Sequence, residues 1–312
     1  MIPWRYHLVS IMAIFLALGL GVVVGTTVIN PGLVKNLNSQ TDELTQHVRD
    51  LQKNLSDLQS QLATMDAFSE QAMPYLVGDE LFGRQAVIVT EEGVDARAVA
   101  QTRRALDLSA AEVLTTLTVR PTMSGESPAA QHDLAALLGV SATTAPVELS
   151  SEAARSLARR LATDPNGDLS GRPDVLGEML SQGFLTSSAP DISDSTLKDI
   201  GGRGQMVVVV GGGAVGELSP TSARFMEPFV TDLVAAGVVS GAGESLAADD
   251  LFVSELRSSV DDSSGAPLVT VDNVDLPIGA SAMVLGLHDA LANGTGGDYG
   301  VKDGVTRLLP PA

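Results

Sequence analysis

Three polar residues in the last fifth of the chain have the types and spacing that could bind a ligand. Asp272 ends an apolar run that begins at Leu268 and predicts a buried strand, and Asn273 and Asp275 follow it before a helix expected from Ile278. Ligands of open α/β sheets bind at this carboxyl edge. The same residue types also cap helices and shape turns. A ligand or cation contact and a structural turn both remain open, and the pattern favours the turn.

A glycine-rich segment matches the Gly-x-Gly-x-x-Gly pattern at Gly211–Gly216, between a predicted strand and a predicted helix. In dinucleotide-binding folds such glycines let a pyrophosphate approach a helix N-terminus. Here the match follows the third predicted strand, Glu217 and Pro220 crowd the helix start, and Asp232 falls inside the helix instead of closing a ribose site. We therefore expect a flexible turn and no bound cofactor.

Residues that bind metals or act as nucleophiles form no recognisable constellation. The chain has no cysteine, which excludes disulfides and thiolate metal sites. The acid pairs 249–250 and 261–262 lie in turn-like segments, and no Gly-x-Ser-x-Gly motif is present. The histidines are far apart in sequence, at His7, His47, His132 and His288. We predict a non-enzymatic protein without a visible metal site, although folding could bring His132 and His288 together.

The element that organises the chain is an uncharged run at residues 8–29. As a helix it would cover about 33 Å, enough to cross a bilayer. Arg5, beside Trp4 and Tyr6, places the positive charge before the run, which predicts a cytoplasmic N-terminus at residues 1–7 and an extracytoplasmic remainder. A cleaved signal peptide is the alternative, but the run is longer than a typical signal core.

Two glycines in this run, Gly21 and Gly25, form a Gly-x-x-x-Gly motif. Such a pair lets two membrane helices approach closely, so it predicts helix pairing in the bilayer. Glycine is also common in membrane helices without a pairing role, and the sequence leaves both interpretations open.

A heptad repeat follows the apolar run and predicts a parallel coiled-coil stalk at residues 33–73, with Pro74 ending the helix. The flanking e and g positions are largely uncharged, so pairing with a second copy and with a different chain both remain open. The expected core positions are Val34, Leu37, Leu44, Val48, Leu51, Leu55, Leu58, Leu62 and Met65.

Residues 78–312 predict an extracytoplasmic, Rossmann-like α/β domain with a mostly parallel sheet, because apolar runs alternate with amphipathic segments. Strands are expected at 85–90, 112–119, 206–210, 238–240 and 268–272. Helices are expected at 94–108, 128–139, 150–163, 173–183, 219–237 and 278–292. The net charge of −19 disfavours nucleic acid as a partner and favours solubility.

Several motifs together resemble the actinobacterial MctB family, the family of mycobacterial copper transport protein B, called SteB in corynebacteria. The resemblance extends over essentially the whole chain. It rests on Trp4–His7 before the apolar run, Leu16–Thr26 within it, the heptads, Val271–Asp275, Gly297–Gly300 and Leu308–Pro310.

This resemblance implies two roles. One is cell separation, in which a SteA-like membrane partner and the protein regulate peptidoglycan hydrolysis at the septum. The other is copper transport or copper homeostasis that limits copper accumulation. Copper as a ligand is implied by the resemblance alone. A stalk that holds a folded domain suits the first role better, since one helix cannot form a pore. The family motif residues of unknown role are Asp272, Asn273, Asp275, Gly279, Tyr299 and Gly300.

Overall fold

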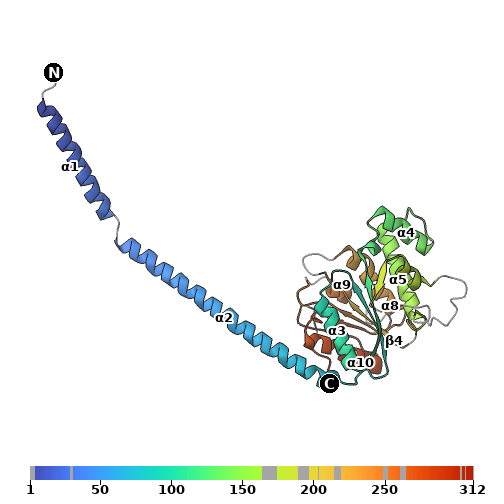
Figure 1. Cartoon of the computed structure of the whole chain (residues 1–312). Helices are drawn as coiled ribbons and strands as arrows, with labels where there is room; N and C mark the ends of the chain where they lie inside the picture. Colours follow the sequence, from blue (N-terminus) through green and yellow to red (C-terminus); the bar gives the residue numbers. More distant parts are fainter. Residues whose placement is uncertain are drawn as a thin grey trace. The chain divides into compact units, whose positions relative to one another are not determined.

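A computed structural model describes residues 4–28, 31–163, 174–188, 197–202, 204–213, 219–248, 252–260, 265–302, 304–305 and 307–311. The chain divides into two units, Met1–Met65 and Asp66–Ala312 (Figure 1). The described residues of the first unit are helical, and the second unit is an α/β domain that also includes the end of the long helix α2.

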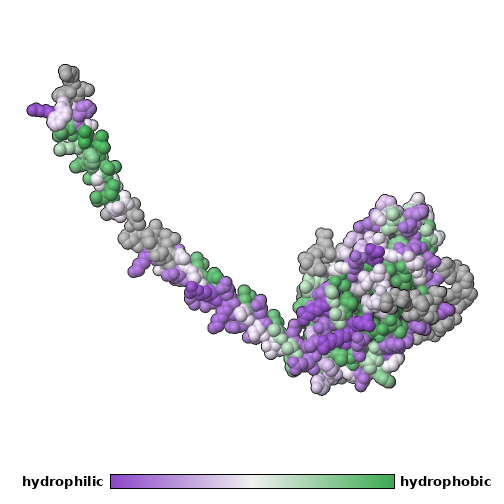
Figure 2. All heavy atoms as spheres, viewed as in Figure 1, coloured by the Kyte–Doolittle hydropathy of each residue, from purple (hydrophilic) through white to green (hydrophobic). Residues whose placement is uncertain are grey.

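The first helix, α1 (Trp4–Val28), is apolar along most of its length (Figure 2). Its segment Trp4–Thr26 is long and apolar enough to cross a membrane, and no other helix in the described part of the chain meets that test. The predicted span at 8–29 lies almost entirely within α1, while Ile29 falls outside the described residues.

The second helix, α2, runs from Pro31 to Val77. A proline at the first helical position costs no hydrogen bond, because that N–H would have no partner in the helix. The prediction that Pro74 ends the helix is wrong, since the helix continues for one turn beyond it. Met73 and Val77, both fully buried, hold this last turn against the core despite the N–H that proline lacks.

The α/β domain contains a seven-stranded sheet in the order β3-β2-β1-β4-β5-β6-β7. Six strands are parallel, and β3 pairs antiparallel with β2 at one edge, which confirms the mostly parallel sheet expected from the sequence. The strands are β1 Gln85–Glu91, β2 Glu112–Val119, β3 Leu185–Ser187, β4 Gln205–Val210, β5 Ser240–Gly243, β6 Leu268–Val271 and β7 Gly297–Tyr299.

Helices cover both faces of the sheet (Figure 1). Alternate residues of β4 show the two layers: Val207 and Val209 face one core, and Met206, Val208 and Val210 face the other. On the first face lie α4 Pro128–Leu138, α5 Pro146–Ala162, α6 Val175–Ser181, α8 Glu227–Ala235 and α9 Phe252–Ser259. On the second lie α3 Ala96–Leu108, α10 Pro277–Asn293 and the end of α2.

Among the predicted strands, the main difference is at β5, expected at 238–240 and found at Ser240–Gly243. Three further elements, β3, β7 and α9, were not predicted from the sequence. The sequence of β5, Ser-Gly-Ala-Gly, lacks the bulky side chains that mark a strand. A Cβ on Gly241 would lie 2.5 Å from the sulfur of Met283, and one on Gly243 would lie 2.6 Å from Val274. The strand is made of small residues because α10 and the preceding turn pack directly on it.

Candidate functional site

Polar residues gather at the carboxyl edge of the parallel sheet, where each strand ends. Glu91 ends β1, Glu244 follows β5, Asp272 follows β6 and Gly300 follows β7. These residues come from distant parts of the sequence, and parallel strands bring their ends to one edge. This edge is where ligands of open α/β sheets bind, so its chemistry decides what the domain can do.

Asp272, which the sequence analysis singled out, is completely buried and forms an ion pair with Arg257 of α9. Arg257 Nη1 lies 3.1 Å from Asp272 Oδ2. Asp272 also accepts hydrogen bonds from the main-chain N–H groups of Val301 at 2.7 Å and Lys302 at 3.2 Å. The carboxylate is thus saturated by the protein and ties the chain after β7 to β6.

The same segment explains Gly300, a second family motif residue. Its φ of +130° is a conformation that residues with side chains rarely adopt. A Cβ there would lie 2.0 Å from Asp272 Oδ1. Gly300 therefore allows the main chain to reach the carboxylate of Asp272.

Arg257 makes further contacts that fix it in place. Its Nε donates to Thr270 Oγ1 at 2.8 Å, and its Nη2 donates to the carbonyl oxygen of Tyr299 at 3.0 Å.

Burial, followed by the charges of Asp289 and Asp298, raises the pKa of Tyr299 above its ordinary value. The Tyr299 hydroxyl therefore stays protonated at neutral pH.

A second buried ion pair lies beside the first. Lys302 Nζ is 3.0 Å from Glu244 Oε1 and also donates to the carbonyl oxygen of Ala248 at 2.5 Å. The other Glu244 oxygen accepts from the N–H of Val253 at 3.1 Å. Both charges are almost fully shielded from water, with side-chain exposures of 10% and 1%. The pair joins the turn after β5 to the C-terminal segment.

The three remaining family motif residues shape the turn before α10. Asp275 Oδ1 accepts from the N–H of Leu246 at 2.6 Å. Asn273 is completely buried, its carbonyl accepts from the N–H of Leu276, and its two side-chain polar atoms have no partner among the described residues. A Cβ on Gly279 would lie 2.1 Å from that Asn273 carbonyl, so only glycine fits there. The hydrogen bond from Leu276 to Asn273 closes a tight turn.

The glycine-rich loop meets β1 at the point where the sheet order reverses, between β1 and β4. Gly211–Gly213 are described, and the rest of the motif up to Gly216 falls outside the described residues. Glu91 is only 3% exposed, and its carboxylate accepts from the N–H of Gly212 at 3.2 Å and from the hydroxyl groups of Ser219 and Ser222. A phosphate at this place would have to displace a buried carboxylate.

Metal-binding residues do not cluster in the part of the chain that the structure describes: it holds no group of three or more His, Cys, Asp or Glu side chains that could bind an ion. His288 lies on α10, and its Nδ1 is 2.8 Å from the carbonyl oxygen of Glu80. This contact fits the structural role expected for that histidine.

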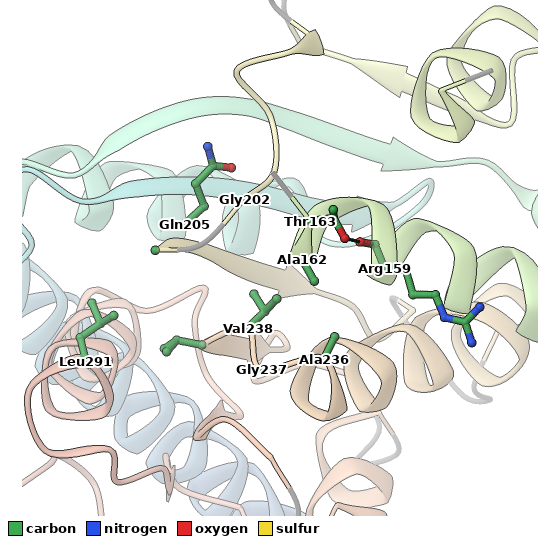
Figure 3. Close-up of a pocket in the computed structure, with 11 residues that line it drawn as sticks. Arg159, Ala162, Thr163, Gly202, Gln205, Ala236, Gly237, Val238 and Leu291 are labelled. Atoms are coloured by element: carbon green, nitrogen blue, oxygen red, sulfur yellow. Dashed lines mark hydrogen bonds between the residues drawn. The ribbon is translucent and has the colours of Figure 1, made fainter. Parts of the chain in front are cut away.

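A cavity of about 580 Å³ lies at the opposite, amino edge of the sheet (Figure 3). Its described lining includes Arg159 and Ala162 of α5, Gln205 at the start of β4 and Val238 before β5. The Gln205 amide is already engaged with the carbonyl oxygen of Asp199 and the N–H of Gly201. Sequence analysis did not find this cavity, which has no motif of its own.

Outside the α/β domain, the predicted coiled-coil positions of α2 are exposed wherever their side chains are described. The side chains of Val34 and Leu37 fall outside that part. Exposures range from 51% to 67% for Leu44, Val48, Leu51, Leu55, Leu58, Leu62 and Met65. In α1, nothing lies within 4 Å of a Cβ built on Gly21 or Gly25. Among the described residues, these side chains and glycines are left uncovered.

A family model described as "Copper transport outer membrane protein, MctB" matches residues 1–310. Proteins named "Copper transporter MctB" from Mycobacterium tuberculosis and Mycobacterium bovis are each 28% identical to the chain, over 97% of its length and 98% of theirs. The protein of that name from Mycobacterium leprae is 27% identical over the full length of both chains. These matches include the apolar helix, α2 and the α/β domain together.

Proposed function

The chain belongs to the MctB family, and from this premise we propose that it is a non-enzymatic scaffold of the cell envelope that acts through partner binding. The observation that carries the proposal is the apolar stripe along α2. Leucines at heptad spacing, each more than half exposed, are costly in water and become favourable when a second helix covers them. Leucine at d with valine or leucine at a favours two parallel helices.

The proposed topology follows from α1. Arg5, with Trp4 and Tyr6 at the interface, keeps the N-terminus in the cytoplasm and places the domain outside the cell membrane. All copies are then anchored at the same end, which favours a parallel arrangement of α2. Gly21 and Gly25 would let the α1 helices approach each other closely.

The polar edge of the sheet supports a role without catalysis. Asp272 and Glu244 are buried in ion pairs, and Glu91 is buried and hydrogen-bonded, so these carboxylates hold loops and are not offered to a substrate. We place cell separation first: the domain, together with a SteA-like membrane partner, would regulate septal peptidoglycan hydrolases from its stalk. The family resemblance supplies this partner, and the stalk supplies a means of reaching it.

Copper transport or homeostasis is the second candidate, because relatives over nearly the full length carry the name "Copper transporter MctB". Copper would be the cargo, not a resident cofactor. One apolar helix cannot enclose a path for an ion, so this role would require several α1 helices or another membrane protein.

The first test of assembly uses the absence of cysteine in the chain. In the full-length, membrane-embedded protein, Leu58→Cys at a d position should form disulfide-linked dimers on oxidation. Ser60→Cys, on the outer face of the same helix, is the matched control and should not. Adding Leu51→Glu and Leu55→Glu should abolish the Leu58→Cys link. Equal linking at Leu58 and Ser60 would contradict a specific seam.

The second test separates the two roles in cells. A strain carrying Leu51→Glu with Leu58→Glu should fail to separate after division and keep its normal copper content. A strain with Ser56→Glu and Ser60→Glu should behave as the parent. Normal separation with raised cellular copper would favour the copper candidate instead.

A further inference from the structure

Two exposed aromatic residues lie at the end of α2, where the helix joins the α/β domain. Phe68 is 67% exposed and Tyr75 is 91% exposed. Beyond α1, the exposed aromatic side chains of the described residues are these two and Phe82, while the others lie in the cores. A chain with only 4% aromatic residues thus keeps two of them in water on one helix.

The two aromatics continue the heptad register of the stalk. They are seven residues apart, so they lie on the same face of the helix. Both fall in the g column, which holds polar residues further up the stalk: Gln40, His47, Asn54 and Gln61. The change from polar to aromatic begins where the helix reaches the domain. Residues at g flank the apolar seam and contact the partner helix.

The opposite face of the same turns is already occupied by the domain of its own chain. Asp66 pairs with Arg97 at 3.3 Å, Glu70 pairs with Arg104, and Met73 and Val77 are fully buried. Spacings of four, three and four residues place these positions on one face. At about 100° per residue, Phe68 and Tyr75 point roughly the other way. Their own domain therefore cannot cover them.

We propose that Phe68 and Tyr75 dock on the α/β domain of a second copy of this chain. The inference rests on the self-assembly in the proposed function. In a parallel pair, a g residue reaches the e position of the next heptad on the partner. For Phe68 this is the partner subunit's Met73, which its own domain covers. The aromatic ring thus meets that domain beside α3.

Two arginines on this edge of the domain also favour this occupant. Residues 1–65 hold four basic and four acidic residues, so the net charge of −19 belongs to residues 66–312. On this acidic domain, the α3 edge next to α2 presents Arg97 and Arg104, each about half exposed. Guanidinium groups stack favourably on aromatic rings. The contact extends the interface from the stalk to the domains and fixes each domain on the other chain.

Crosslinking of the full-length protein in membranes tests this directly. A Phe68→Cys/Arg104→Cys double variant, treated with a short bismaleimide, should give covalent dimers. Each single variant should give none, because g positions lie apart across the seam. The matched control is Phe68→Cys/Arg155→Cys, since α5 covers the other face of the sheet. The side chains at 68, 104 and 155 are 67%, 49% and 42% exposed, so these changes remove no part of the buried cores.

The Leu58→Cys disulfide separates failure of this inference from failure of self-assembly. If Leu58→Cys links but Phe68→Cys/Arg104→Cys does not, the stalk assembles and the cross-domain contact is wrong. Equal linking to Arg155→Cys, or an adduct with the mass of a different protein, also overturns it. Loss of the Leu58→Cys link contradicts self-assembly itself.

Discussion

Arg257 and Asp272 form an ion pair inside the α/β domain, with 3.1 Å between Nη1 and Oδ2 and side-chain exposures of 8% and 0%. The pair joins α9 to the end of β6, and the same carboxylate holds the N–H groups of Val301 and Lys302. The Asp272 carboxylate lies at the edge where ligands usually bind, but here it holds other segments of the same chain together.

Replacing Asp272 with alanine should lower the free energy of unfolding by about 3–5 kcal/mol, because it leaves a buried guanidinium without its carboxylate. Asp107→Ala is the control, since Asp107 is 56% exposed and 3.8 Å from Arg103. That change should stay within about 0.5 kcal/mol. Urea unfolding of both variants measures the difference, and equal midpoints would exclude a structural role for Asp272.

Gly300 and Gly294 offer a matched pair for the close approach after β7. Both have positive φ, +130° and +69°, but only Gly300 is packed against Asp272. Gly294→Ala should cost about 1–2 kcal/mol from the backbone conformation alone. Gly300→Ala should cost clearly more, because its methyl group would displace the carboxylate. Thermal unfolding compares the two variants. A smaller loss of stability at position 300 than at position 294 would contradict the close packing of Gly300 against Asp272.

Glu227 should make the domain less stable as the pH rises. Burial, and then the charge of Glu255, raise the pKa of Glu227 from 4.5 to about 7, and its Oε1 has no partner among the described residues. Between these values the folded state binds more protons than the unfolded state, so the free energy of unfolding falls with pH. Because the group is only half buried, the loss is on the order of 1 kcal/mol.

The measurement is urea unfolding at pH 5 and pH 8. Glu227→Gln should flatten the difference between the two conditions, since glutamine does not titrate. The pKa of Asp232 is also raised by burial, but Asp232 is present in both proteins, so its contribution cancels in the comparison. An unchanged pH dependence in the variant would assign the effect to another group.

The parts of the fold predicted from sequence are those whose signal is local. Continuous apolar runs marked β1, β2 and β4, and their spacing by helices predicted the parallel sheet. The prediction placed β5 too early because its glycines carry no strand signal of their own. They are required by the close packing of α10, whose residues lie some forty positions away. Pro74 was taken as a helix end because the burial of Met73 and Val77 is not visible in the local sequence.

At the carboxyl edge of the sheet, too, local signals could be predicted from the sequence and long-range contacts could not. Asp272 and Asp275 could be found because they follow a strand. Their setting could not, since Arg257 and Lys302 come from other elements. One signal was present: residues 204–312 contain only four basic residues, and two of them are buried with carboxylates. In a segment so rich in acidic residues and so poor in cations, each lysine or arginine is a reason to expect a pair with a carboxylate.

Copper binding by the full-length protein in detergent, titrated separately with Cu(I) and Cu(II), should reveal no tight site in the single chain. Soft metals need clustered sulfur or imidazole ligands. The chain lacks cysteine, and six of its nine methionines are buried in the cores: Met73, Met123, Met179, Met206, Met226 and Met283. Tight binding of one ion per chain would show that folding assembles a site, and the copper role would then lead. One ion per two chains, lost in Leu51→Glu/Leu58→Glu, would place the site at the seam and make assembly itself the copper-binding event.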